Sequence, residues 1–137
     1  MSSEWSFGEN MMTDYLGYYP LHDSVKQPIW GTEQAACFDL YTHFEPGVVV
    51  RGYDSVNRER LYEVFTGGDT RDSGNTDRHI LIPMQSRVLI PTGLIFDIPE
   101  GFSVRLHSRS SLSLKRGLMM VTGEGIIDSD YCEECYM

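Results

Sequence analysis

Side chains that could bind an anion are gathered in the segment Ser108–Ser113, where Arg109 stands among four serines. We expect Ser110 or Ser111 to cap a short helical turn that Gly117 ends, since serine is a common N-cap and glycine a common C-cap. The first N–H groups of such a turn, the serine hydroxyls and the guanidinium group can together bind phosphate. The spacing alone also fits an ordinary capped turn with surface cations, and it favours that simpler interpretation.

A second group of reactive side chains follows in the segment Gly123–Tyr131. The pattern predicts a β-hairpin with a tight turn between Gly123 and Gly125, and a ligand could approach the backbone at Gly125 because it has no side chain. Asp128 follows Ile127 along the strand and therefore faces the opposite side. A free aspartate has a pKa of about 3.9, so this carboxylate could orient or deprotonate a water molecule at neutral pH. A plain hairpin with solvated acids would have the same pattern.

Charge and composition limit the partners that the chain could have. The formal net charge of −9 disfavours nucleic acid as a partner, because the chain has little positive charge to neutralise a phosphate backbone. The basic residues are nevertheless clustered, with Arg105, Arg109, Lys115 and Arg116 close together. No apolar run approaches the ~20 residues of a membrane span. The three cysteines are too few and too odd in number for a disulfide framework, so we expect a cytoplasmic protein.

The elements that must position these side chains are short strands. Brief apolar runs separated by Pro and Gly turns are typical of an all-β sandwich or barrel, and no apolar stripe is long enough for a sizeable helix. Residues 1 to about 30 are expected to form an extended lead-in, and residues 67–78 a polar surface loop. The turn between the first two strands is expected at Pro46-Gly47. The expected strands are Ala36–Tyr41, Val48–Val50, Leu61–Phe65, Ile80–Ile82, Val88–Ile90, Leu94–Phe96 and Phe102–Val104.

Taken together, these segments resemble the homotrimeric dUTPase family. Three of the family's five motifs stand in the family's order, at Thr32–Tyr41, Ser108–Gly117 and Gly123–Tyr131. The linking strands between Arg87 and Phe102 match the family as well. The resemblance implies an all-β, distorted jelly-roll (β-clip) subunit with one short helical turn after the second motif. It also implies a homotrimer whose sites are shared between subunits.

The resemblance assigns roles to five polar residues. Asp39 would lie near a Mg2+-bound triphosphate and hold the metal through water. Arg109, the Ser110 hydroxyl and the Ser111 N–H would contact the phosphates. Asp128 would activate the water that attacks the α-phosphorus. The implied reaction is hydrolysis of dUTP to dUMP and pyrophosphate, which keeps uracil out of DNA.

Base and sugar recognition is implied for the third motif. The hairpin from Thr122 to Ile127, with Gly125 at its closest point, would recognise uracil through backbone groups and exclude the 5-methyl group of thymine. The Tyr131 ring would pack on the deoxyribose and leave no room for a 2′-hydroxyl. The family usually has asparagine at the position of Thr122, and glycine at that of Ser111, the second phosphate contact. Threonine donates one hydrogen bond rather than two, and serine keeps the N–H.

We expect one dUTPase-like domain over residues 1–137, with residues 52–78 as a probable insertion and a candidate binding surface for a protein partner. After Tyr131 the chain has Cys132-Glu133-Glu134 in place of the family's small basic pair ending in glycine. The sequence stops at Met137, before the fourth motif and the glycine-rich arm. We therefore expect weak or no turnover from this form alone.

Other interpretations remain open. A dCTP deaminase shares the fold, but usually has Gly-Phe or Gly-Trp where this chain has Asp130-Tyr131. A non-catalytic nucleotide-sensing or protein-binding member is the third possibility. The cysteines of Cys132-Glu133-Glu134-Cys135 would point to opposite sides of a strand, which disfavours a metal or redox pair. The four histidines are scattered in the sequence and are expected to be hydrogen-bonded or exposed rather than metal ligands: His22, His43, His79 and His107.

Overall fold

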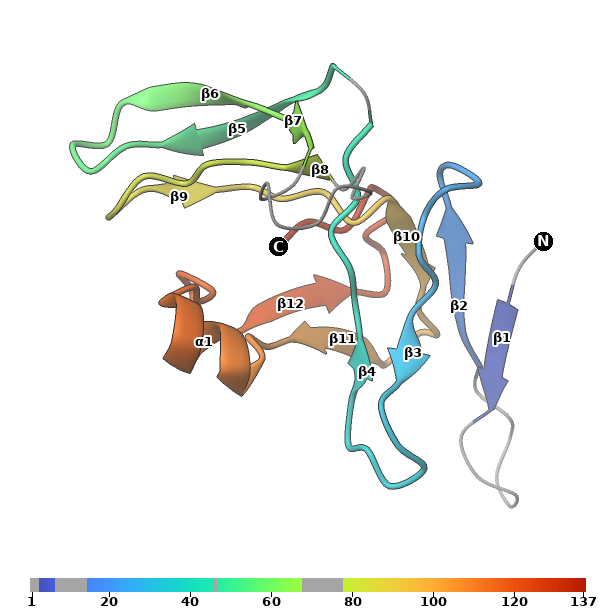
Figure 1. Cartoon of the computed structure of the whole chain (residues 1–137). Coiled ribbons are helices and arrows are strands. Elements are labelled where there is room, and N and C mark those ends of the chain that lie inside the picture. The colour runs from blue at the N-terminus through green and yellow to red at the C-terminus, as the bar shows by residue number, and fades with distance from the viewer. Residues whose placement is uncertain (1–2, 7–14, 46, 68–77) are drawn as a thin grey trace.

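The chain is built almost entirely of short strands (Figure 1). The computed structural model describes residues 3–6, 15–45, 47–67 and 78–137. These residues form twelve strands and one helix, and the predicted all-β class is confirmed. Their bounds are β1 Ser3–Ser6, β2 Tyr15–Pro20, β3 Ile29–Trp30, β4 Phe38–Asp39, β5 Val49–Tyr53, β6 Glu59–Glu63, β7 Phe65–Thr66, β8 Arg78–His79, β9 Arg87–Val88, β10 Leu94–Asp97, β11 Ser103–Leu106, α1 Ser110–Arg116 and β12 Gly125–Asp128. Within these residues, no helix has the length and apolar character needed to cross a bilayer.

The N-terminal region supplies a core strand rather than the expected lead-in. Strand β2 lies between β1 and β10 in an antiparallel sheet, with Tyr18 opposite Phe96. Leu16 and Tyr18 alternate with more exposed neighbours and are buried, at 9% and 3% exposure. The expectation was wrong because this alternation spans only two apolar positions among many aromatic residues.

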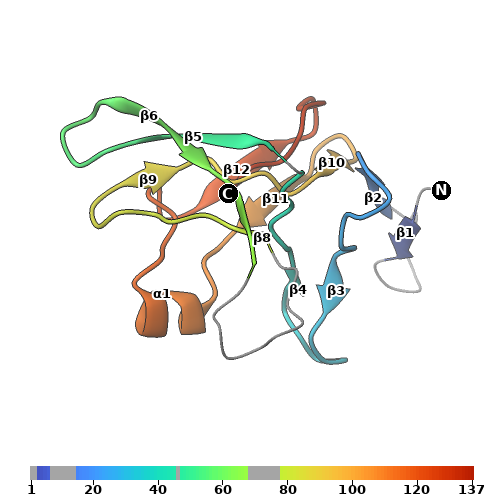
Figure 2. The same cartoon turned by 45° about the horizontal axis from the view of Figure 1, so that its top comes forward.

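Strands β11 and β12 complete the core beneath that sheet. They pair antiparallel, with Val104 opposite Ile127 and Leu106 opposite Gly125. Val104, Leu106 and Ile127 are buried together with the central strands. The β6–β5–β9 sheet projects at the end of the molecule away from β1, as both views show (Figures 1 and 2).

The last residues of the chain pair with the segment that leads into β10. Cys135 donates its N–H to Leu94 O at 2.7 Å, and Met137 and Ile90 exchange two backbone bonds. Between them Thr92 is only 1% exposed, and its hydroxyl donates to Cys135 O at 2.7 Å. Residues 135–137 are therefore integrated in the core.

Three predicted strands are shorter or absent. Of Val88–Ile90 only Val88 lies in a strand, β9. Within Ala36–Tyr41 only Phe38–Asp39 is a strand, paired with β3. The predicted strand Ile80–Ile82 is wrong, since pairing stops at His79 of β8 and the following residues are irregular. Pro83 comes next and cannot donate a ladder hydrogen bond, which explains why an apolar run here does not extend the sheet.

Much of the segment 52–78 is paired strand rather than loop. Strands β5 and β6 form a hairpin whose turn is closed by the Asp54 carboxylate, which accepts N–H groups from Val56 and Arg58 at 3.0 and 2.9 Å. The backbone hydrogen bond from Arg58 and further donors lower the pKa of Asp54. Gly52 permits close pairing with β9, because a Cβ there would lie 2.3 Å from Arg87 O. Residues 68–77 of the predicted loop lie outside the described residues, as does Pro46 of the predicted turn, in which Gly47 has φ 74°.

Helix α1 follows β11, as the predicted short turn requires, but its cap differs. Arg109 is the N-cap residue, without a side-chain cap bond, and Ser110 and Ser111 already lie in the helix. The predicted serine cap is therefore wrong. The Ser108 Oγ accepts the Met120 N–H at 2.7 Å, and this bond joins the residues before and after α1. The predicted end at Gly117 is confirmed, with φ 66° in the left-handed region.

Candidate nucleotide site

The first and second motifs meet at an ion pair. Arg109, at the start of α1, places its Nη1 3.4 Å from Oδ2 of Asp39 on β4. The Arg109 and Asp39 side chains are 60% and 28% exposed, so solvent or a ligand can reach both groups. An exposed pair of this kind contributes only about 0–1 kcal/mol to stability. Its importance is that it brings a cationic and an anionic group from distant parts of the sequence to one place.

The donors at the start of α1 are also accessible. Ser110 and Ser111 are exposed, and the N–H groups of a helix's first residues have no intrahelical acceptor. The first N–H groups that do bond within the helix are those of Leu112 and Ser113, which donate to the Arg109 carbonyl at 3.0 and 3.1 Å. The first turn therefore presents N–H groups, hydroxyls and a guanidinium group beside Asp39.

The third motif lines a pocket of about 330 Å³. Four of its lining residues were predicted from the sequence to contact base, sugar or attacking water: Gly125, Ile127, Asp128 and Tyr131. The others are mostly apolar: Leu89, Leu106, Ile126, Cys135 and Tyr136. A mostly apolar cavity with a few polar groups is the usual form of a small-molecule site.

Strand β12 and the turn after it arrange these groups. Ile127 is buried and Asp128 is exposed, so the predicted alternation is confirmed. The Tyr131 N–H donates to Asp128 O at 3.1 Å, and both residues line the pocket. The Tyr131 hydroxyl donates to Glu134 O at 3.0 Å, which fixes the far end of the ring.

Gly125 lies close to two neighbouring side chains. An added Cβ would lie 3.1 Å from Met120 Cε and 3.3 Å from Leu106 Cβ, tighter than most side-chain contacts. A substitution would therefore force Met120 and Leu106, the second of which lines the pocket, to shift by a few tenths of an ångström. The prediction that the backbone can approach a ligand closely at Gly125 is consistent with its place in the lining.

The predicted hairpin from Thr122 to Ile127 is wrong in its pairing. A turn does exist, since Gly123 donates to Met120 O at 3.0 Å with φ 77°. The strand that follows pairs with β11, on the other side of α1, rather than with the residues just before the turn. Thr122 is exposed and does not line the pocket. A turn sequence cannot show which strand will pair with the segment after it.

Sequence reasoning missed an ionic network beside the pocket. Glu124 accepts from Arg105 Nη1 at 2.8 Å, and its other oxygen lies 3.2 Å from His107 Nε2. The spacing of Arg105 on β11 and His107 just after it, two positions apart, was the available signal. The network offsets the positive charge of Arg105, one member of the basic cluster.

The C-terminal cysteines do not form a pair. Cys132 is exposed, whereas Cys135 is 1% exposed, and burial raises the pKa of its thiol to about 11. The predicted strand at Cys132–Cys135 is wrong, since β12 ends at Asp128 and these residues are irregular. The two side chains nevertheless lie in different environments, as predicted. Tyr136, which also lines the pocket, has its pKa raised to about 12, chiefly by a hydrogen bond with Glu134. Both groups are neutral at physiological pH.

The predicted residues therefore form two separate groups in one chain. Asp39, Arg109, Ser110 and Ser111 gather at the start of α1, and none of them lines the pocket that contains Asp128. The first group offers donors for phosphate, and the second offers an apolar wall, a ring and a carboxylate.

Much of the chain is similar to known proteins. The dUTPase family model matches residues 75–137, which include α1 and β12. A deoxyuridine 5′-triphosphate nucleotidohydrolase of Chlamydia felis is 42% identical over 92 residues, which cover 67% of this chain and 56% of that protein. Proteins of the same name from Rhizobium etli and Mesorhizobium japonicum are 42% and 45% identical over 65 residues, or 47% of this chain and 42% and 40% of theirs.

The chain has an all-β fold, with exposed donor groups at the start of α1 and a separate pocket beside β12. Through residues 75–137 the chain belongs to the dUTPase family. It spans about half the length of the curated relatives that it matches.

Proposed function

We propose that this chain is part of an enzyme that hydrolyses dUTP to dUMP and pyrophosphate. The observation that carries the proposal is the pocket in which Gly125, Ile127, Asp128 and Tyr131 meet, within the family-matched segment. The relatives' name, deoxyuridine 5′-triphosphate nucleotidohydrolase, supports the same substrate.

Each residue of the pocket has a specific part in the proposed reaction. The Tyr131 ring, held by its bond to Glu134 O, packs on the deoxyribose and excludes a 2′-hydroxyl. Backbone groups near Gly125 pair with the base. Asp128 takes a proton from the attacking water, and a positioned base of this kind contributes typically ~10²–10⁴-fold in rate.

The phosphates are held at the other group. Arg109 and the first turn of α1 donate to the triphosphate, with the Ser110 hydroxyl and the Ser111 N–H as the closest donors. A guanidinium group suits this task because it presents several N–H groups in a fixed plane. The Asp39 carboxylate orients the Arg109 side chain before substrate arrives.

The donor set at Asp39 fits Mg2+. This ion is usually bound through one or two carboxylates and substrate phosphates, and it keeps several waters. Asp39 is a partly exposed carboxylate beside the proposed phosphate donors, so it would hold the ion through water. When bound, Mg2+ would offset negative charge on the phosphates.

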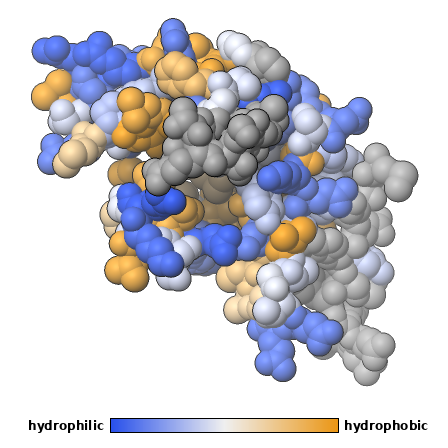
Figure 3. Space-filling view, viewed as in Figure 1, coloured by the Kyte–Doolittle hydropathy of each residue, from blue (hydrophilic) through white to orange (hydrophobic). Residues whose placement is uncertain are grey.

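The two groups would form one site through assembly of a homotrimer. Large apolar side chains are exposed in and after α1, including Leu114 at 86%, Met119 at 73% and Val121 at 74%. Apolar side chains stand among hydrophilic ones on the surface around α1 (Figure 3). Exposed apolar side chains can mark interaction sites, and here they support contacts between subunits that bring Arg109 of one chain to Asp128 of another.

Pyrophosphate release from dUTP with Mg2+ tests the proposal. We expect Asp128→Asn to reduce the rate by at least ~100-fold. Asp130→Asn is the matched control, because Asp130 is an exposed neighbour that does not line the pocket, and it should retain the wild-type rate.

Two further measurements separate the competing activities. Calorimetry with a non-hydrolysable dUTP analogue measures binding independently of turnover, and an affinity equal to that for the UTP analogue would contradict the role of Tyr131. Ammonia release from dCTP would instead identify a deaminase. Hydrolysis undiminished in Asp128→Asn would refute the proposed base.

A further inference from the structure

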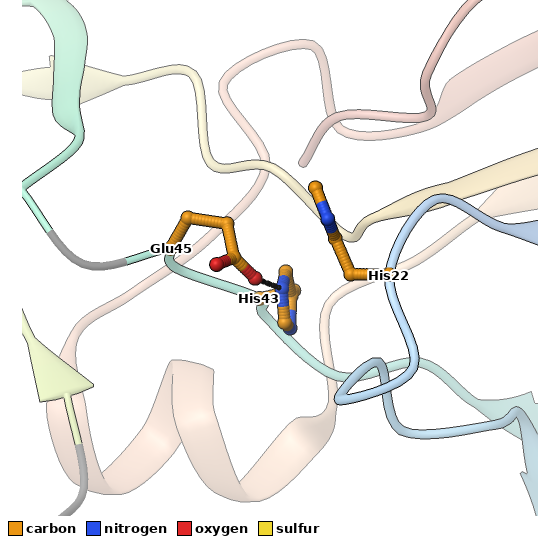
Figure 4. Close-up of side chains that lie close together, drawn as sticks. All are labelled: His22, His43 and Glu45. Carbon is orange, nitrogen blue, oxygen red and sulfur yellow. Dashed lines mark hydrogen bonds and ion pairs between the residues drawn. The ribbon is translucent and has the colours of Figure 1, made fainter.

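Two histidines and a glutamate lie together (Figure 4), and none of the three lines the nucleotide pocket. His22 stands in the turn after β2, and His43 and Glu45 lie on the connection between β4 and β5. Their potential ligand atoms all lie within 4.8 Å of one another. The His22 and His43 rings are stacked with centroids 5.5 Å apart, and His43 Nε2 lies 2.6 Å from Glu45 Oε1.

Backbone hydrogen bonds anchor both segments that carry the cluster. Leu21 donates its N–H to Gly93 O at 2.8 Å, and His43 donates its N–H to Pro91 O at 2.9 Å. Both segments are thus tied to residues 91–93. Gly93 has φ 71°, and a Cβ there would lie 3.2 Å from the His43 ring, so glycine leaves the room that the imidazole occupies.

One side of the cluster faces an open cavity. All three residues line a pocket of about 300 Å³ together with Val48–Arg51, Leu89, Pro91, Glu134 and Tyr136. The His43 side chain is 11% exposed and the Glu45 side chain 32%, whereas His22 is exposed. An exposed imidazole can rotate toward the other two groups without disturbing the core.

This donor set matches transition metals rather than Mg2+. Two imidazoles and a carboxylate suit zinc and other first-row divalent ions, whereas Mg2+ requires oxygen ligands. Zinc bonds to nitrogen and oxygen are about 2.0–2.2 Å, which places tetrahedral ligand atoms ~3.3 Å apart. The observed separations, from 2.6 Å to 4.8 Å at most, bracket that value. We propose that His22, His43 and Glu45 bind a divalent transition-metal ion, with Zn2+ as the best match and the open position facing the pocket.

A metal ion at this place would have a structural effect. It would join the turn after β2 to the β4–β5 connection, and so fasten the end of β2 to that connection. Three protein ligands leave one position for water or another small ligand from the pocket. The site is distinct from the proposed Mg2+ position, since Asp39 is not a member of the cluster.

Cobalt(II) absorption and zinc competition with a chromogenic chelator test the proposal on the full chain. We expect one Zn2+ per chain and a tetrahedral Co2+ spectrum. His22→Asn and Glu45→Gln should each weaken Zn2+ binding by at least tenfold. His22 is exposed, so its replacement tests binding without endangering the fold.

Two control variants separate this site from other metal-binding groups. His107→Asn removes a histidine that also contacts a glutamate, Glu124, but lies outside the cluster, and it should bind Zn2+ as the wild type does. Asp39→Asn should likewise leave Zn2+ binding unchanged. Equal Zn2+ affinity in all four variants and the wild type would overturn the proposal and leave a simple His43–Glu45 hydrogen bond.

Discussion

Replacing the buried Thr92 by valine tests how the C-terminal residues are held. The Thr92 hydroxyl donates to Cys135 O at 2.7 Å and accepts the Leu94 N–H at 3.2 Å, in a side chain that is 1% exposed. Valine has nearly the same shape but makes neither bond. The Cys135 carbonyl would still accept the Thr92 N–H, at 3.1 Å, so the larger penalty is at the Leu94 N–H.

The expected loss follows from these two bonds. A net hydrogen bond contributes about 0.5–1.5 kcal/mol, and two lost bonds therefore lower the free energy of unfolding by about 1–3 kcal/mol. For a domain of this size that is a fall in Tm of roughly 3–5 °C per kcal/mol. Calorimetry or urea unfolding at one fixed protein concentration measures it, since assembly makes stability depend on concentration.

Two control variants make the test specific to the buried hydroxyl. Thr92→Ser keeps the hydroxyl and should retain more stability than Thr92→Val, despite the loss of a methyl group. Thr122→Val changes an exposed threonine and should alter the free energy of unfolding by less than about 0.5 kcal/mol. Equal stability of Thr92→Val and the wild type would refute the reasoning.

Three further predictions concern the thiol, the pocket wall and the division of the site. The pKa of Cys135 is raised from 9.0 to about 11, so the folded chain binds more protons than the unfolded chain between these values. The stabilising contribution of this thiol is therefore lost as pH rises from about 9 to 11. Urea titrations of the wild type and Cys135→Ala over this pH range should show that difference. Gly125→Ala should weaken binding of a non-hydrolysable dUTP analogue by roughly tenfold, or about 1.4 kcal/mol, whereas Gly31→Ala, which adds a Cβ in open space, should not. Mixing inactive Arg109→Ala and Asp128→Asn chains should restore about one quarter of wild-type hydrolysis if subunits exchange and share sites, and no recovery would contradict sharing.

Local sequence signals predicted the elements whose neighbours lie close along the chain. Gly117 ends α1 because a residue in the left-handed conformation is needed there, and glycine adopts it without strain. The Ile127–Asp128 alternation was predictable because side chains on a strand face opposite sides. Such signals depend only on backbone geometry and immediate neighbours.

The errors in the strands arose where distant pairing decides the structure. Strand β2 was missed because its burial depends on pairing with β10, which lies far along the chain. The apolar run Ile80–Ile82 was taken as a strand, yet the structure gives it no partner among the described residues. Propensity indicates that a segment can be extended, but a sheet also needs a matching edge.

The same physical reason explains which candidate site residues the sequence indicates. The sequence proposes Asp39, Arg109 and Asp128 because family motifs are contiguous along the chain. His22 and His43 stand in no motif, and they meet because residues 91–93 anchor both of their segments.

The division of the nucleotide residues into two groups follows from where each motif lies in the fold. Arg109 and the serines leave the end of β11 toward β4, while Asp128 stands at the opposite end of the strand that pairs with β11, across from Ser103. Antiparallel pairing thus carries the two motifs to opposite ends of one two-stranded sheet. A substrate that needs both groups would be contacted at its base by one chain and at its phosphates by a second. For this reason the arrangement of one chain favours catalysis by an assembly over catalysis within a single subunit.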